Sequence, residues 1–139
     1  MPHKEDNFFE APMKKLAILL MISFIISTGC ASTEQIRAGN RENLMLLSSG
    51  MTKAEVLQVM GTETIRVDME VITNPYRSEM YQAGGHTFEL LFYYTDIKKT
   101  DGAITDDELT PIVLKDGKVD GWGWTYWNNL VQKYEIRIR

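Results

Sequence analysis

The longest apolar stretch of the chain lies close to its start. Residues 16–26 (LAILLMISFII) are apolar apart from Ser23, and Lys14 and Lys15 precede them. A helix that spans a membrane needs roughly 18 or more apolar residues, so this run is too short for a permanent anchor. Lysines at the entry, a short apolar run and small residues at the exit are typical of a secretory signal. A buried core helix is the alternative, which the lack of a polar face disfavours.

The start of this signal lies within the chain. Residues 1–12 carry three acidic side chains, which are unusual ahead of a signal, whereas Met13 directly precedes the two lysines. We therefore expect translation to start at Met13. In either case residues 1–29 are expected to be a signal peptide and to take no part in the fold.

The only cysteine of the chain, Cys30, follows this segment. Gly29 and Cys30 resemble a bacterial lipobox, although Ser27 stands where an aliphatic residue is usual. We expect cleavage before Cys30 and acylation of its sulfur, which would hold the protein on a membrane. Ordinary cleavage after Ala31, with Gly29 and Ala31 as the small pair, is the alternative.

Two helices are expected after the cysteine. Residues 31–39 (ASTEQIRAG) are small and polar, so we assign residues 30–39 to a lipidated tether and residues 40–139 to one domain. Asn40 is expected to cap a first helix that runs to about Ser48.

The second helix has a strong N-terminal signature. Thr52-Lys53-Ala54-Glu55 is a capping box, and Met51 and Val56 stand at the two positions of a hydrophobic staple. Val56 and Met60 belong to the expected buried face. Gly61 is expected to end the helix as a left-handed cap.

After this helix the period changes from helical to alternating. Strands are expected over residues 64–72, 77–82 and 87–94, with a hairpin turn at Gly84-Gly85 between the last two. Apolar residues occupy both faces of the third strand: Phe88, Leu90, Phe92 and Tyr94 on one, Leu91 and Tyr93 on the other. That strand is therefore expected to be central and covered on both sides.

A polar loop over residues 96–108 leads to a second hairpin. Its arms, residues 110–115 and 118–124, flank Asp116-Gly117, a pair that tolerates positive φ at both positions. Thr125 is expected to cap a final helix with a helical apolar stripe: Trp127, Leu130, Val131 and Tyr134. These elements predict an α+β domain in which two N-terminal helices and a C-terminal helix pack on one face of an antiparallel sheet of three to five strands.

Charge and histidine content restrict the chemistry. Three residues of each sign lie in residues 1–29, so residues 30–139 carry 12 basic and 16 acidic side chains, a net charge of −4. An acidic domain disfavours a nucleic-acid binder.

The two histidines offer little for catalysis or metal binding. His3 leaves with the signal, and His86 follows two glycines, as an exposed turn residue would. Because no nucleophile with a base and no zinc ligand set is recognisable, we expect a non-catalytic protein without metal or cofactor.

The polar loop contains part of a calcium-binding pattern. Asp101-Gly102-Ala103-Ile104 with Glu108 matches its second half, but Ile97 and Lys99 occupy the first and third ligand positions. A solvated acidic loop is the preferred interpretation and a calcium site the alternative. Three acidic residues at the end of the loop are candidates for contact with a partner: Asp106, Asp107 and Glu108.

Aromatic residues gather near the C-terminus: Trp122, Trp124, Tyr126 and Trp127. In a strand, Trp122 and Trp124 point the same way and can form a platform for a sugar or for a partner's side chains, so both are candidate interaction residues. The alternative is a place in the core, with Gly121 and Gly123 leaving room for the final helix.

Residues 49–56 (SGMTKAEV), with Met60-Gly61 closing the helix, resemble the signature of small outer-membrane lipoproteins. These belong to the small-protein-A or outer-membrane-lipoprotein-A type, the BamE-like family. The resemblance covers about residues 44–94 and implies two helices on a three-stranded antiparallel sheet, as in β-lactamase-inhibitor-like domains. The second half is instead similar to an uncharacterised family of short bacterial lipoproteins, which implies no activity.

Together these features predict a non-catalytic lipoprotein of the cell envelope that acts through contacts with another envelope protein, in outer-membrane assembly or maintenance. Ala31, rather than an aspartate, after Cys30 favours the outer membrane, with the domain in the periplasm. The alternative function is a binding module for a glycan, a peptidoglycan fragment or a small ligand, through the tryptophans.

Overall fold

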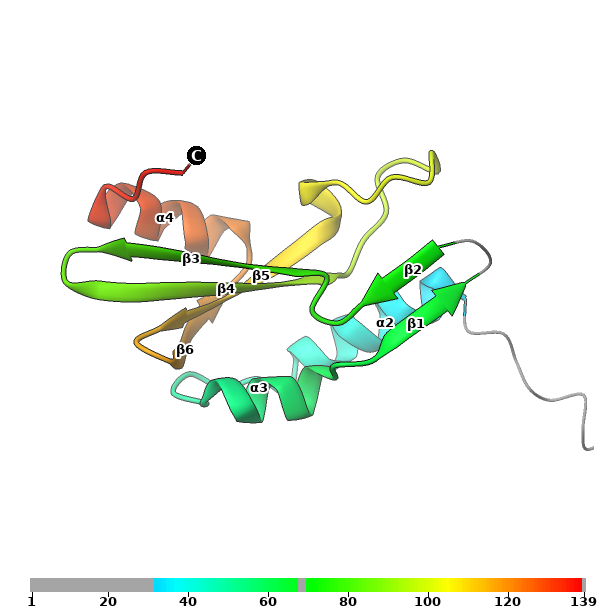
Figure 1. Cartoon of the computed structure of the whole chain (residues 1–139), viewed down its shortest axis with the longest axis horizontal. Coiled ribbons are helices and arrows are strands. Elements are labelled where there is room, and N and C mark those ends of the chain that lie inside the picture. Colours follow the sequence, from blue (N-terminus) through cyan, green and yellow to red (C-terminus); the bar gives the residue numbers. More distant parts are fainter. Residues whose placement is uncertain (1–31, 68–69, 139) are drawn as a thin grey trace, which may run out of the picture. The chain divides into compact units, whose positions relative to one another are not determined.

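The computed structural model describes residues 32–67 and 70–138, so the expected signal peptide and Cys30 lie outside the described residues. In the described part, no helix is long and apolar enough to cross a membrane. Helices and strands follow the expected order (Figure 1). The elements are α2 (Thr33–Leu44), α3 (Lys53–Met60), β1 (Thr64–Val67), β2 (Glu70–Thr73), β3 (Arg77–Ala83), β4 (His86–Tyr94), the 3-10 helix η1 (Asp106–Glu108), β5 (Leu109–Lys115), β6 (Lys118–Trp122) and α4 (Trp124–Tyr134).

The strands form two antiparallel sheets. The main sheet has the order β3-β4-β5-β6, and β1 and β2 form a separate two-stranded sheet. The prediction of one strand over residues 64–72 was wrong, because the chain reverses between Val67 and Glu70. In one continuous strand Ile65 and Ile72 would face opposite ways, since an odd number of positions separates them. The reversal pairs them, and both pack against the same core cluster.

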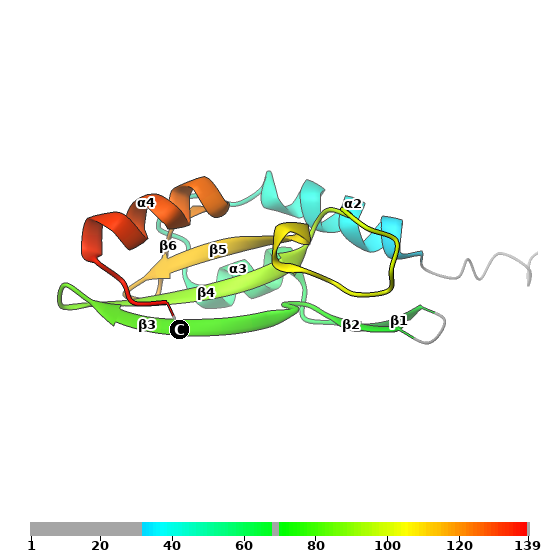
Figure 2. The same ribbon diagram turned by 90° about the horizontal axis from the view of Figure 1, so that it is seen from above.

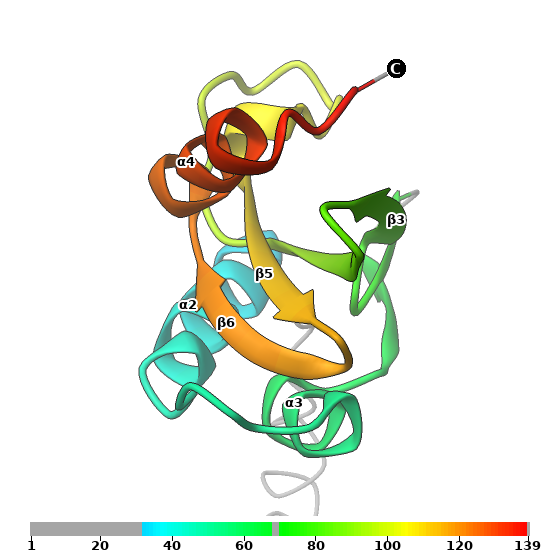
Figure 3. The ribbon, with the colours of Figure 1, turned by 90° about the vertical axis from the view of Figure 1, so that its left-hand side faces the viewer.

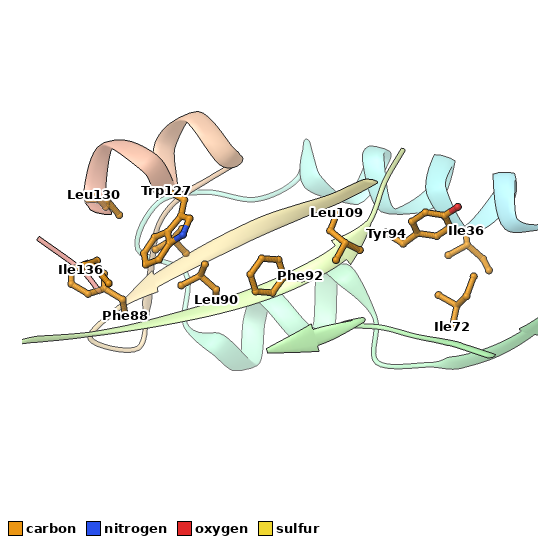
Figure 4. Packing of buried hydrophobic residues seen from close by; sticks show 11 residues of the cluster. Ile36, Ile72, Phe88, Leu90, Phe92, Tyr94, Leu109, Trp127, Leu130 and Ile136 are labelled. Carbon is orange, nitrogen blue, oxygen red and sulfur yellow. The ribbon is translucent and has the colours of Figure 1, made fainter. Parts of the chain in front are cut away.

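The main sheet is covered on both faces. Two clusters of buried side chains line it: Phe88, Leu90, Phe92, Trp127 and Leu130 toward α4, and Val56, Met60, Leu91 and Tyr93 toward α3. Figure 4 shows the first cluster, and Figure 3 shows α4 and α3 on opposite sides of β5 and β6. β4 is therefore central, as predicted. The expectation that the helices share one face was wrong, because β4 and β5 carry apolar side chains on both faces.

The helix α3 begins as the sequence predicts. Thr52 Oγ1 accepts a hydrogen bond from Glu55 N at 3.3 Å, and Glu55 Oε2 accepts one from Thr52 N at 2.7 Å. Gly61 ends the helix at a φ of 81°, although its ψ of 159° is extended rather than helical. The capping box is thus confirmed, and the left-handed cap is corrected to an extended glycine.

The helix α2 differs from the prediction. It starts at Thr33 with Ser32 as its N-cap, so residues 33–39 are helical and are not a tether. Asn40 lies inside the helix and does not cap it. Ser32 and Gln35 form a second capping box, with bonds of 3.2 Å and 2.8 Å. Within the described residues, the first helix therefore begins at Thr33, ahead of the predicted cap Asn40.

The second hairpin is confirmed, and the start of the last helix is corrected. Asp116 and Gly117 have φ values of 51° and 82°, which this turn requires. Gly123, at a φ of 88°, separates β6 from α4 and is the N-cap in place of Thr125. This glycine with positive φ between the two elements ends the strand before residue 124.

Candidate functional site

Buried polar side chains gather at one end of the domain. The described residues include five of them, which we call the polar end: Arg37, Asn40, Asn74, Thr95 and Glu108. They surround the place where β4 ends, beside α2 and the β1-β2 sheet (Figure 1). Because an unpaired buried polar group is costly, each of these side chains needs hydrogen-bond partners, and the geometry supplies them.

Two arginines attach α2 to the end of β4. Arg37 Nη1 donates to Tyr94 Oη at 2.9 Å, and its Nε and Nη2 donate to Glu34 at 3.0 Å and 2.6 Å. Arg41 donates to the carbonyl of Thr95 at 2.6 Å and to Glu34 at 2.8 Å. The bonds from Arg41 and then Arg37 hold the pKa of Glu34 below its usual value, so the network is charge-assisted.

An asparagine pair lies beneath this network. Asn40 and Asn74 exchange hydrogen bonds between their amides, at 3.3 Å and 3.1 Å. Asn40 Nδ2 also donates to the carbonyl of Tyr94 at 2.8 Å. The pair joins α2, the residue that follows β2 and the end of β4, three segments that are distant in the sequence.

The buried carboxylate of Glu108 holds the backbone of the polar loop through hydrogen bonds. Its Oε1 accepts bonds from the amides of Lys98 and Lys99 at 2.6 Å and 3.3 Å, and its Oε2 accepts one from the amide of Thr105 at 2.9 Å. The amides of Lys98 and Thr105 lower the pKa of this carboxyl. Only 1% of Glu108 is exposed, so its prediction as a residue that contacts a partner was wrong.

The same geometry explains the partial calcium pattern. Glu108 is the glutamate that would close a calcium loop, and both of its carboxylate oxygens already accept hydrogen bonds from backbone amides. Among the described residues, no group of three or more His, Cys, Asp or Glu side chains is placed to hold a metal ion. The glutamate therefore has a structural role in this loop.

A groove opens beside the polar end, between α2, the first residues of the loop and the start of α4. Its volume is about 590 Å³, and its lining includes Arg37, Arg41, Leu44, Ile97, Asp107 and Trp124. Two of the predicted interaction residues, Asp107 and Trp124, therefore share one groove with two arginines that the sequence did not single out. The predicted Asp106 does not line the groove and pairs with Arg77 Nη1 at 2.6 Å.

The two candidate tryptophans do not form one platform. Trp122 pairs with Ile112, which belongs to the cluster that faces α3, and is 38% exposed. Trp124 packs against Phe92 on the α4 side, and its Nε1 donates to the carbonyl of Leu109 at 2.8 Å. The prediction that both side chains point the same way was wrong, because the strand ends between them.

The two glycines beside these tryptophans have different roles. A methyl group at Gly121 would lie 2.6 Å from the ring of Tyr126, so this position leaves room for the final helix, as predicted. Nothing lies within 4 Å of a methyl group at Gly123. Gly123 is instead required by its positive φ, which the steric interpretation missed.

His86 lies at the opposite end of β4, where its side chain contacts the neighbouring hairpin turn. Its Nδ1 lies 2.7 Å from Asp116 Oδ2, and Asp116 Oδ1 accepts the amide of Thr87 at 3.0 Å. The amide of Thr87 and then His86 lower the pKa of Asp116. The pair joins the two hairpin turns, which gives the histidine a structural explanation.

The fold and the groove define a small α+β domain with two antiparallel sheets and a polar groove at one end. The chain belongs to the family described as protein of unknown function DUF3192, whose model matches residues 29–129. Comparison with curated proteins and with solved structures gave no match. The matched range includes Cys30 and the groove residues named above.

Proposed function

We propose that this protein is a non-catalytic lipoprotein of the cell envelope that is anchored through Cys30 and binds another envelope protein through the groove. The observation that carries the proposal is the position of the groove against α2, whose N-cap Ser32 stands two residues after Cys30. Anchored in this way, the domain holds the groove close to a membrane. Confinement to a surface raises the effective concentration of the protein near membrane partners.

Several sequence features support the location. The short apolar run with its lysines is typical of an exported protein. The family match begins at Gly29, so the cysteine belongs to the region that the family shares. Ala31 favours the outer membrane, with the domain facing the periplasm. The resemblance of residues 49–56 to the BamE-like signature supports a role in outer-membrane assembly or maintenance.

The composition of the groove suits a protein partner. Arginine and tryptophan are enriched where protein interfaces concentrate their binding energy, and both Arg41 and Trp124 line this groove together with Asp107. Leu44 adds apolar surface. A glycan-binding module remains the alternative function, but the separation of Trp122 from Trp124 leaves it a single tryptophan in the groove.

The anchor is tested by changing the cysteine. We expect the wild-type protein to incorporate labelled palmitate and to partition into detergent, and Cys30→Ser to abolish both. Two or more acyl chains are needed for stable attachment, since each buried methylene contributes only about 0.8 kcal/mol. A Cys30→Ser protein that still carries the label would contradict the proposal.

The partner site is tested by photo-crosslinking in native membranes. A crosslinker at position 107 or 41 should capture the same envelope protein, whereas one at position 135, an exposed site after α4, should not. Asp107→Lys should reduce capture at position 41 several-fold, and Glu135→Lys should leave it unchanged. Absence of a product at both groove positions, with binding of a glycan by the purified protein through Trp124, would favour the binding-module function.

A further inference from the structure

The distance between the anchor and the folded domain is set by the chain itself. Ser32 already caps α2, and only Ala31 stands between it and Cys30. Each residue spans at most about 3.6 Å, so the Cα atoms of Cys30 and Ser32 lie no more than about 7 Å apart in any conformation. With acyl chains on Cys30, the first turn of α2 is therefore confined to the membrane surface.

Two other segments lie at the same end as the first turn of α2. Figures 1 and 2 show the β1-β2 sheet and the polar loop extending beside the N-terminal half of this helix. Ile36 of α2 packs with Ile72 of β2, and Glu34 lines the groove together with Ile97 of the loop. A methyl group at Gly102 would lie 3.7 Å from Glu70 Oε1, so the loop also contacts β2.

The surface of this end has the side chains that an interface with lipid favours. Val71 is 51% exposed and Ile97 is 38% exposed, although both are large and apolar. Lys98 and Lys99 follow Ile97 directly. Lysines place their apolar stems along a lipid surface while their ammonium groups stay in water. Acidic residues are also present at this end, since Asp96 pairs with Lys98, so the surface is not strongly basic.

We propose that this end of the domain, where the side chains of Val71 and Ile97 are exposed, rests on the surface of the lipid bilayer. The inference depends on the anchor of the proposed function and adds the orientation of the domain. β4 has nine residues, which span about 30 Å. The two hairpin turns joined by His86 and Asp116 are therefore about 30 Å along the strand from the end that rests on the lipid.

Fluorescence quenching by lipid tests this orientation. Acylation leaves no free thiol on Cys30, the only native cysteine, so one introduced cysteine can be labelled in the full-length lipoprotein. The labelled variants are Val71→Cys and Ile97→Cys at the proposed contact, and Gln82→Cys and Lys118→Cys as exposed controls beside the far turns. Each is reconstituted in phosphatidylcholine vesicles that contain a nitroxide-labelled lipid.

We expect quenching at positions 71 and 97 to be several-fold stronger than at positions 82 and 118, with the same order when anionic lipid is added. Equal quenching at all four positions, in samples that float with the vesicles, would overturn the orientation and leave the anchor intact. Failure of the wild-type protein to float would overturn both the anchor and the orientation. The flotation step thus separates the two proposals.

Discussion

The two N-terminal helices begin alike but are attached to the sheet in different ways. Both start with a capping box, at Ser32 in α2 and at Thr52 in α3. α3 buries Val56 and Met60 in an apolar cluster. α2 buries one isoleucine together with an arginine and an asparagine. Apolar contacts are tolerant of geometry, whereas hydrogen bonds are directional, so α2 is held in one orientation by the network that also shapes the groove.

The largest loss of stability is expected when apolar contacts between α3 and the sheet are removed. Met60→Ala should lower the free energy of unfolding by about 3 kcal/mol, because it removes a side chain that is 1% exposed and leaves a cavity under α3. Met45→Ala is the matched control, since Met45 is 85% exposed and should change the stability by less than about 0.5 kcal/mol. Equal losses in chemical denaturation would show that α3 is not held by this contact.

Removing hydrogen bonds between α2 and its neighbours should lower the free energy of unfolding by somewhat less. Asn40→Ala removes the partner of Asn74 and one donor to the carbonyl of Tyr94, and should lower the free energy of unfolding by about 2 kcal/mol. Asn43→Ala, on the same helix at a half-exposed position, is the control and should have little effect. If Asn40→Ala were as stable as the wild type, the asparagine pair would not hold α2.

This contrast explains which parts of the fold the sequence predicted. Residues 52–61 and 87–94 were assigned correctly, because their buried residues are apolar and recur with the period of a helix or a strand. Residues 33–39 were assigned to a tether because their buried face is mostly polar and leaves no apolar stripe. The capping box of Ser32 and Gln35 was present in the sequence and is the signal that identifies this helix.

The candidate site was predicted in part for a similar reason. Asp107 was selected as an acidic residue at the end of the polar loop and Trp124 as half of a tryptophan platform, and the structure places both in the groove. Arg37 and Arg41 were missed because, apart from Glu34, their hydrogen-bond partners lie 57 and 54 positions away along the chain. Glu108 was misjudged, since composition does not distinguish an exposed carboxylate from one that accepts buried amides.

The contribution of Glu108 to the stability of the polar end can be measured separately through its dependence on pH. Backbone amides of Lys98 and Thr105 hold the pKa of Glu108 below the ordinary value of 4.5. A carboxyl whose pKa is lower in the folded state stabilises the fold above its unfolded pKa. That contribution is lost as the pH falls through the folded pKa. Glu108→Gln cannot titrate, so the variant lacks this dependence.

We therefore expect Glu108→Gln to lower the free energy of unfolding by about 1.5 kcal/mol at pH 7, the range of a hydrogen bond to a charged group. The difference from the wild type should shrink as the pH falls below about 4.5, since the wild-type carboxyl then becomes protonated as well. Asp101→Asn, at an exposed position of the same loop, controls for the loss of one negative charge. Denaturant titrations between pH 7 and pH 3 measure the stability of all three proteins.

A constant difference in stability between wild type and Glu108→Gln across this range would show that the ionised carboxylate does not hold the loop. The loop would then depend on the apolar contacts of Ile104 and Leu109 with the core, as α3 depends on its own.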